Sequence, residues 1–156
     1  MLSPQSSKAH FNLGLIYEEK KEYDKAIAQY KRAQEIDPNY FLVYNNLGNV
    51  YASKGLYDAA IVEYKLCLQA KPDYFLAHNN LGNIYALKQE YENAIMEYKK
   101  SIALNPDFDK AHFNLGIAYF NKNLIEDAKK EWEAVLRINP GHGGALKNLE
   151  LLKKAE

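Results

Sequence analysis

Apolar and small residues recur along this chain at a fixed interval of 34 residues, with polar residues between them in an equally regular pattern. Residues 44–51 read Tyr-Asn-Asn-Leu-Gly-Asn-Val-Tyr, and residues 78–85 read His-Asn-Asn-Leu-Gly-Asn-Ile-Tyr. Related segments occupy residues 10–17 and 112–119. An interval of this size indicates a stacked structural repeat, and it sets how the rest of the chain is divided.

Each repeat is expected to form two helices. Within a repeat numbered from 1 to 34, positions 4, 7, 8 and 11 share one face of an amphipathic helix. A turn is expected near position 15, most clearly at Gly55. The second helix opens with an acidic residue at position 18, which suits the partial positive charge of a helix N-terminus. Proline at position 32 ends it, because proline lacks the backbone N–H and restricts the residue before it.

The division that follows has a flexible lead, four repeats and a terminal helix. The expected segments are the lead at 1–6, repeats at 7–40, 41–74, 75–108 and 109–142, and a capping helix at 143–156. Leu146 and Leu149 begin this last helix like a fifth first helix, but Glu150 replaces the expected glycine and lysines make its other side polar. A stacked array needs such a solvating end. The prediction is therefore nine helices and no strand.

The residues that recur are those of a known motif. They are leucine at position 7 (Leu13, Leu47, Leu81, Leu115), glycine at 8 (Gly14, Gly48, Gly82, Gly116), tyrosine at 11 (Tyr17, Tyr51, Tyr85, Tyr119), alanine at 20 (Ala26, Ala60, Ala94, Ala128), an aromatic residue at 24 (Tyr30, Tyr64, Tyr98, Trp132) and proline at 32 (Pro38, Pro72, Pro106, Pro140). This pattern over residues 7–142 resembles the tetratricopeptide repeat family. The resemblance implies an all-α fold, a right-handed α-solenoid of helix-turn-helix pairs with a concave groove. Glycine at position 8 and alanine at position 20 are expected to face each other.

A set of amides and apolar residues is predicted to line that groove. At about 100° per residue, positions 2, 5, 6, 9, 12 and 13 of the first helix fall opposite its core positions. Position 6 is asparagine in every repeat and in the terminal helix, and an amide can pair with both the C=O and the N–H of an extended peptide. The predicted peptide-binding residues are Asn12, Asn45, Asn46, Asn49, Asn79, Asn80, Asn83, Lys110, Phe113, Asn114, Ile117 and Asn148. Phe11 and Phe120 are also expected to point into the groove.

Two devices of the family resemble parts of this surface. The asparagines at position 6 resemble the asparagine ladder of O-GlcNAc transferase repeats, which hold extended segments. The alternative is that these amides are solvated or bonded locally. The second device is the carboxylate clamp for acidic chaperone tails, for which this chain offers Asn45, Asn49, Asn80, Lys110 and Asn114. The middle three match the clamp, but the outer two lack the required positive charge, so a clamp is not favoured.

Composition narrows the classes of function further. The formal net charge is zero, with 20 basic and 20 acidic side chains, which argues against a dedicated binder of nucleic acid or of an anionic membrane. No apolar run approaches a membrane span, and residues 1–7 contain no apolar signal segment, which favours a cytoplasmic location. The single cysteine, Cys67, excludes an internal disulfide and is expected to be a small buried filler.

No catalytic, cofactor or metal site is expected. The sequence contains no glycine-rich phosphate loop, no nucleophile elbow and no Cys/His metal spacing. His10, His78 and His112 lie one or two repeats apart, too far for a shared zinc ion, and packing within or beside the core is favoured. The leading hypothesis is a non-catalytic protein-interaction module that binds an extended peptide. The alternatives are a scaffold that forms homo-oligomers through the uncapped N-terminal edge, and a substrate-recruiting domain of a larger enzyme.

Overall fold

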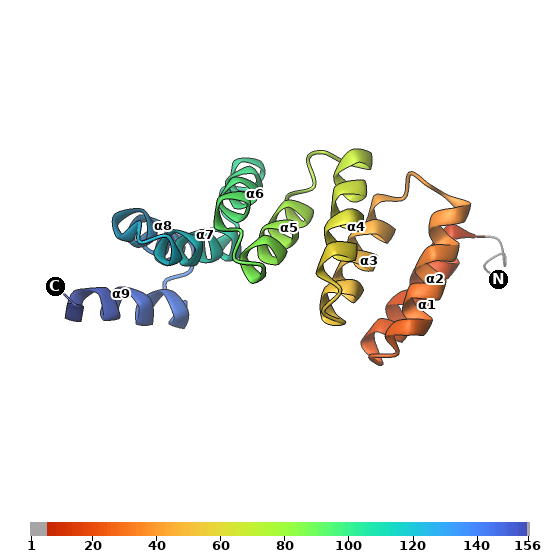
Figure 1. Cartoon of the computed structure of the whole chain (residues 1–156), viewed down its shortest axis with the longest axis horizontal. Helices are drawn as coiled ribbons and strands as arrows, with labels where there is room; N and C mark the ends of the chain where they lie inside the picture. The colour runs from red at the N-terminus through yellow and green to blue at the C-terminus, as the bar shows by residue number, and fades with distance from the viewer. Residues whose placement is uncertain (1–5, 156) are drawn as a thin grey trace. The chain divides into compact units, whose positions relative to one another are not determined.

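The computed structural model describes residues 6–155, and these residues form nine α-helices and no strand, as predicted. The helices are α1 (Ser7–Glu19), α2 (Tyr23–Ile36), α3 (Phe41–Ser53), α4 (Tyr57–Ala70), α5 (Phe75–Leu87), α6 (Tyr91–Leu104), α7 (Asp109–Asn121), α8 (Ile125–Ile138) and α9 (Gly143–Ala155). They belong to two compact units, Met1–Asp73 with α1–α4 and Tyr74–Glu156 with α5–α9. Within each unit, consecutive helices form antiparallel hairpins (Figure 1).

The N-terminal lead expected at 1–6 falls almost wholly outside the described residues. Ser6, its last residue, caps α1, and its side chain accepts a hydrogen bond from the backbone N–H of Ala9 at 3.4 Å. A serine in this place satisfies one of the N–H groups that the first turn of a helix leaves without a partner.

The turn inside each repeat is built the same way four times. The residue at position 15 has a positive φ in every repeat: 59° at Lys21, 74° at Gly55, 61° at Gln89 and 60° at Asn123. The backbone N–H of the next residue closes the turn with a hydrogen bond. In the second repeat, the N–H of Leu56 donates to the carbonyl of Tyr51 at 2.9 Å. This arrangement is a common way to end a helix, and glycine adopts it without strain. Only one of the four turns has glycine.

The glycine at position 8 makes room for an aromatic ring. A Cβ added at Gly82 would lie 2.7 Å from Cε1 of Tyr98, and one at Gly48 would lie 2.5 Å from Cε1 of Tyr64. The atoms nearest to this glycine therefore belong to the aromatic residue at position 24, whereas the expected approach to the alanine at position 20 stays a prediction. The ring packs directly against the first helix because glycine places no side chain between them.

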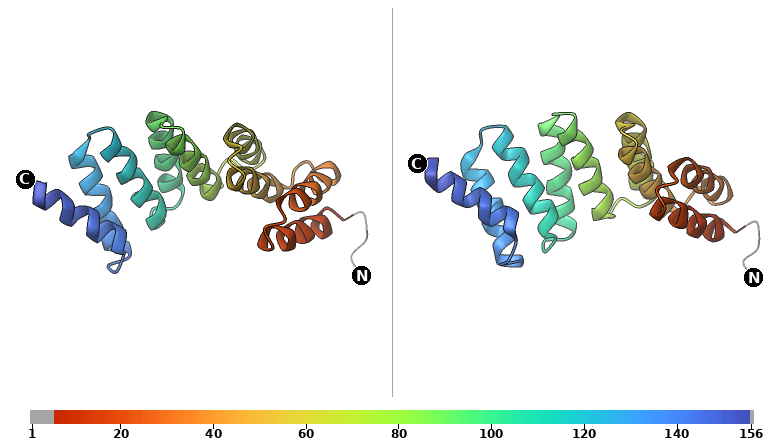
Figure 2. Two further views of the ribbon diagram at one scale, coloured as in Figure 1. Left: turned by 60° about the horizontal axis from the view of Figure 1, so that its bottom comes forward. Right: turned by 90° about the horizontal axis from the view of Figure 1, so that it is seen from below.

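Each unit has its own hydrophobic core. In the first unit the core contains Phe11, Ala26, Tyr30, Ala33, Val43, Leu47 and Val50. In the second it contains Ala94, Tyr98, Leu115, Ala118, Tyr119, Ala128, Trp132, Val135 and Ala145. Ala145 belongs to α9, which lies along α8 (Figure 2). The terminal helix thus covers the apolar side of α8, while its own Leu146 stays exposed.

The helices packed against a first helix explain why the exposure of positions 7 and 10 differs between α3 and α1. Leu47 and Val50 of α3 are completely buried, because α2 packs against them as well as α4. Leu13 and Ile16 of α1 occupy the same positions but are 37% and 48% exposed. No described helix precedes α1, so this apolar edge stays open to solvent among residues 6–155.

Candidate functional site

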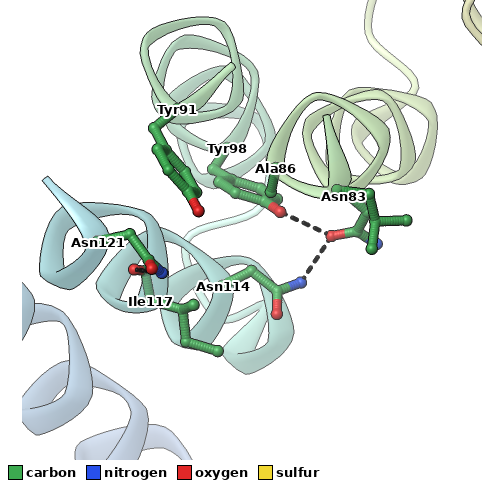
Figure 3. A pocket seen from close by; sticks show the side chains of 8 residues that line it. Asn83, Ala86, Tyr91, Tyr98, Asn114, Ile117 and Asn121 are labelled. Atoms are coloured by element: carbon green, nitrogen blue, oxygen red, sulfur yellow. Dashed lines mark hydrogen bonds between the residues drawn. The ribbon is translucent and has the colours of Figure 1, made fainter. Parts of the chain in front are cut away.

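A cavity of about 400 Å³ lies between α5, α6 and α7 in the second unit, and its wall combines amides with aromatic and aliphatic side chains (Figure 3). Its lining residues are Asn83, Ala86, Leu87, Tyr91, Tyr98, Asn114, Ile117 and Asn121. Three of the predicted site residues, Asn83, Asn114 and Ile117, are among them. The repeat brings them together because position 9 of one first helix faces position 6 of the next.

A hydrogen-bond network orients the two asparagines. The hydroxyl of Tyr98 donates to Oδ1 of Asn83 at 2.9 Å, and Nδ2 of Asn114 donates to the same oxygen at 2.9 Å (Figure 3). Asn114 also makes a longer contact of 3.4 Å to Oδ1 of Asn79. Oδ1 of Asn83 therefore accepts two hydrogen bonds, which uses both of its lone pairs.

The remaining amide groups of this pair have no partner among the described residues. Nδ2 of Asn83 donates to no described group, and Oδ1 of Asn114 accepts from none. Neither belongs to the buried side-chain atoms without a partner, so both are accessible to solvent. The two amides thus retain one donor and one acceptor without a partner in the described protein, and we call Asn83 and Asn114 the amide pair.

Burial of Tyr98 explains why its hydroxyl is a donor in this hydrogen-bond network. Burial raises the pKa of the Tyr98 hydroxyl far above its ordinary value, so the hydroxyl stays protonated and donates a hydrogen bond to Asn83. The ring itself is held against Gly82 and is 2% exposed. The aromatic residue at position 24 therefore orients the asparagine at position 9, a role that the sequence did not predict.

The first unit contains parts of the same arrangement. The Tyr64 hydroxyl donates to Oδ1 of Asn49 at 2.8 Å, which repeats the Tyr98–Asn83 contact. Asn46, in contrast, has leucine at position 9 of the preceding repeat. Its Nδ2 lies 3.4 Å from the Tyr30 hydroxyl, and its Oδ1 accepts from Asn45 at 3.2 Å. The same residue type at position 6 therefore has different partners in the two units.

Three residues that were predicted to face the groove are buried. Asn45 and Asn79 are each 5% exposed, and Phe11 is 8% exposed and belongs to the core of its unit. The prediction of groove-facing side chains at position 5 was wrong for these repeats. A helical wheel assumes one covered side, whereas a first helix inside a stack also contacts the first helix of the next repeat, as α5 contacts α7.

The other predicted residues are distributed more widely. Asn12 and Lys110 are exposed, and Asn80 is half-buried and accepts from Asn79 at 3.5 Å. Phe113 and Asn148 lie in a second cavity together with Ile117. The five candidate clamp positions are divided between the two units.

The histidines at position 4 are bonded to position 23 of the same repeat. The distances from Nδ1 are 2.7 Å for His10 to Gln29, 2.6 Å for His78 to Glu97 and 2.7 Å for His112 to Glu131. In the second case burial pushes the pKa of Glu97 up, but hydrogen bonds from His78 and Lys100 outweigh it and hold the pKa below its ordinary value. No cluster of three or more potential metal ligands occurs among residues 6–155. These pairs join the two helices of one repeat.

Cys67 is completely buried and unpaired by disulfide, and burial raises the pKa of its thiol to about 12. A thiol in that state is a poor nucleophile at neutral pH, which agrees with a packing role. Over the part of the chain that is described, no helix combines the length and the apolar character needed to cross a membrane.

Comparisons with known proteins agree with the repeat fold. A family model described as TPR repeat matches residues 16–55, 48–89 and 82–123, and a model described as tetratricopeptide repeat matches residues 109–142. No curated protein matches the sequence significantly.

Several solved structures share the fold. One described as MamA has a TM-score of 0.86 and 27% identity, with 92% of this chain and 84% of that chain covered. The first TPR of Spaghetti (RPAP3), bound to the HSP90 peptide SRMEEVD, has a TM-score of 0.72 and 30% identity, with 74% and 91% covered. YrrB, described as a TPR protein with an unusual peptide-binding site, is 23% identical with a TM-score of 0.82 over 98% and 79%, a likeness of fold alone.

Proposed function

Because the chain belongs to the tetratricopeptide repeat family, whose repeats generally serve as non-catalytic interaction modules, we propose that it binds an extended peptide. We propose further that the amide pair of the second unit binds the main chain of that peptide. The observation that supports this is the donor and acceptor left over at Asn83 and Asn114 after their contacts with Tyr98 and with each other.

A peptide unit offers the complementary groups. Its C=O accepts from Nδ2 of Asn83, and a neighbouring N–H donates to Oδ1 of Asn114. An extended strand with unpaired main-chain groups gains most from such contacts, since these groups are costly to bury without partners. The amides would therefore supply affinity without selecting a side chain.

The amide pair itself carries no positive charge that would bind an acidic group of a peptide. The peptide SRMEEVD of that related structure is acidic. Here Asn45 and Asn114 stand where a clamp requires cations, and hydrogen bonds to charged groups are about twice as strong as neutral ones. We expect peptide affinity at the amide pair to depend only weakly on salt concentration.

The test is a titration with and without the pair. A peptide array of unrelated extended sequences would first identify binders, and each would then be titrated by fluorescence anisotropy against wild type, Asn83→Ala and Asn114→Ala. Each change should weaken binding by about 1 kcal/mol, roughly a fivefold rise in Kd, which is the net value of one hydrogen bond. The loss should be similar for peptides of different sequence, because main-chain groups are common to all.

Gln69→Ala is the matched control, because it removes an exposed amide from α4, outside this cavity. Circular dichroism and the melting temperature would establish that each variant is folded. Equal affinities for wild type and both asparagine variants, with folding intact, would show that the amide pair does not bind peptide.

Self-association is a second candidate function, favoured by the exposed apolar edge of α1. Leu13 and Ile16 together present an open surface where the equivalent Leu47 and Val50 of α3 are covered by α2. If this edge assembles copies of the chain, sedimentation equilibrium should give a mass that increases with concentration. The double variant Leu13→Lys with Ile16→Lys should remain a monomer. A wild-type monomer at all concentrations would exclude this function.

A further inference from the structure

Resting on the proposed function, we infer that a second cavity, between α7, α8 and α9, is a specificity pocket for one large apolar side chain of the bound peptide, with an acidic residue beside it. This cavity has a volume of about 320 Å³. Its lining residues are Phe113, Ile117, Phe120, Trp132, Asn148, Leu151 and Leu152. We call it the apolar pocket.

The pocket lies one repeat further along than the cavity of the amide pair. Position 9 is Asn83 in the first cavity and Ile117 in the second, and position 12 is Ala86 in the first and Phe120 in the second. Position 6 of the following helix is asparagine in both. The same framework thus presents polar groups at one step and hydrocarbon at the next.

The polar groups near the pocket are mostly satisfied internally. Nε1 of Trp132 donates to the carbonyl of Phe113 at 3.3 Å, so the indole offers only its apolar surface. The ring of Phe113 reaches this place because Gly144 on α9 has no side chain: a Cβ there would lie 2.7 Å from Cζ of Phe113. Asn148 is the one amide in the lining.

Three apolar side chains on the rim remain accessible. Phe120 is 47% exposed, Leu151 is 55% exposed and Ile117 is 36% exposed. Covering hydrocarbon of this kind stabilises a complex by about 25 cal/mol per Å² of apolar area removed from water. The pocket suits a large apolar side chain such as leucine, methionine or phenylalanine, because its lining is apolar except for Asn148.

The position of the apolar pocket next to the amide pair indicates what the pocket binds. Ile117 lines both cavities, so they are neighbours along α7. A peptide whose main chain contacts the amide pair would carry a side chain into the apolar pocket a short distance further on. Because the two cavities share Ile117, the favoured occupant of the apolar pocket is a residue of the same extended peptide.

Two lysines near the pocket are the reason why we expect an acidic residue beside the apolar residue of the peptide. Lys110 precedes Phe113 by three residues on α7, and Lys147 precedes Leu151 by four on α9, so each lies one helical turn away. Neither lysine forms an ion pair with a group in the described part of the chain, whereas Lys154 on α9 is paired with Glu150 at 2.7 Å. Charge complementarity therefore favours an acidic residue next to the apolar one.

Trp132 provides a local readout, because it is the only tryptophan of the chain and lines the pocket. The probes are short host peptides of glycine, serine and threonine with a central Glu-X-Glu, where X is leucine, alanine or 4-bromophenylalanine. A Lys-Leu-Lys version tests the charge. The bromine quenches indole fluorescence only when it lies close to the ring. We expect quenching by the bromophenylalanine peptide, about tenfold weaker binding of the alanine peptide than of the leucine peptide, and weaker binding of the Lys-Leu-Lys peptide.

Phe120→Ala is the main variant, since it places at position 12 the residue found at Ala86 and alters a side chain that is half exposed. It should reduce the difference between the leucine and alanine peptides to less than threefold. Asn83→Ala should weaken both peptides equally and leave their ratio unchanged.

The outcomes separate the two proposals. Binding that depends on Asn83 but shows no preference for leucine over alanine, with no quenching, would overturn the pocket and leave the peptide-binding function standing. Failure of every host peptide to bind would overturn both. Preference for leucine that persists in Phe120→Ala would also contradict the pocket, because the side chain would then bind elsewhere.

Discussion

Glu63 on α4 is a half-buried carboxylate that lacks the partner its position has in other repeats. It occupies position 23, which is hydrogen-bonded to histidine at position 4 in three repeats. In the second repeat position 4 is Tyr44, whose hydroxyl donates instead to the carbonyl of Pro38 at 2.7 Å. Oε2 of Glu63 is buried and has no hydrogen-bond partner among the described residues. Burial raises the pKa of Glu63, and the positive charge of Lys31 only partly opposes this.

We predict that Glu63→Gln increases the free energy of unfolding at neutral pH. A buried polar atom left without a partner costs about 1–3 kcal/mol, and more when it is charged. Glu63 as a whole is half-buried and only one of its oxygens is inaccessible, so the low end applies. We expect a gain of about 1 kcal/mol, which corresponds to a rise in Tm of about 2–4 °C for a protein of this size.

The gain should depend on pH in a defined direction. A carboxyl whose folded pKa is raised binds its proton more tightly in the folded state, so its cost is absent below the unfolded pKa and grows as pH rises through the folded pKa. The ordinary value is 4.5. The advantage of Glu63→Gln should therefore be full at pH 7 and disappear near pH 4. Urea unfolding at both pH values, followed by circular dichroism, measures it.

Two further variants make the test specific. Glu133→Gln neutralises an exposed carboxylate on α8 and should change stability little at either pH. Tyr44→His should stabilise at pH 7 by another route, because His112 at the same position bonds both to Glu131 and to the carbonyl of Pro106 at 3.0 Å. A Glu63→Gln variant that is no more stable than wild type at pH 7, or equally stabilised at pH 4, would refute this reasoning.

Two predictions concern backbone and packing. Gly82→Leu should lower stability by about 3 kcal/mol or more, because even a Cβ would lie 2.7 Å from the Tyr98 ring, and an unchanged melting temperature would contradict the contact. Gln89→Gly should raise stability by up to about 1 kcal/mol, since Gln89 has a φ of 61° and glycine adopts this conformation without strain. Denaturant unfolding would measure it, and a loss of stability would show that the entropy of glycine outweighs the relief.

Periodicity in the sequence was sufficient to predict the helices. Leucine, glycine and tyrosine at positions 7, 8 and 11 define the first helix, and proline at position 32 follows the second by two residues, as Pro38 follows Ile36. The turn was visible at Gly55 but not at Lys21, Gln89 or Asn123, where ordinary residues adopt the same positive φ. Local residue preference marks such a turn only when glycine is present, whereas packing of the two helices imposes it in every repeat.

The candidate site was only partly predictable, because a helical wheel contains no neighbouring helices. It selected Asn83 and Asn114, which line a cavity, but also Asn45 and Asn79, which the structure buries. It could not show that Oδ1 of Asn83 is used by two donors within the protein. Which amide atoms remain for a ligand depends on those internal contacts, and they connect positions 9 and 24 of one repeat with position 6 of the next.

Position 9, rather than the recurring asparagine at position 6, therefore determines what each step of the surface can bind. Asparagine at position 6 occurs in all four repeats and in α9, yet its partners differ from one repeat to the next. Within the second unit, Asn83 pairs with Asn114, whereas Ile117 stands before Asn148. Ile117→Asn should accordingly extend the amide pairing by one step and remove the apolar wall in the same change. The affinity for peptides with a central alanine should then rise relative to the affinity for peptides with a central leucine. An unchanged ratio of the two affinities would show that position 9 does not determine the preference.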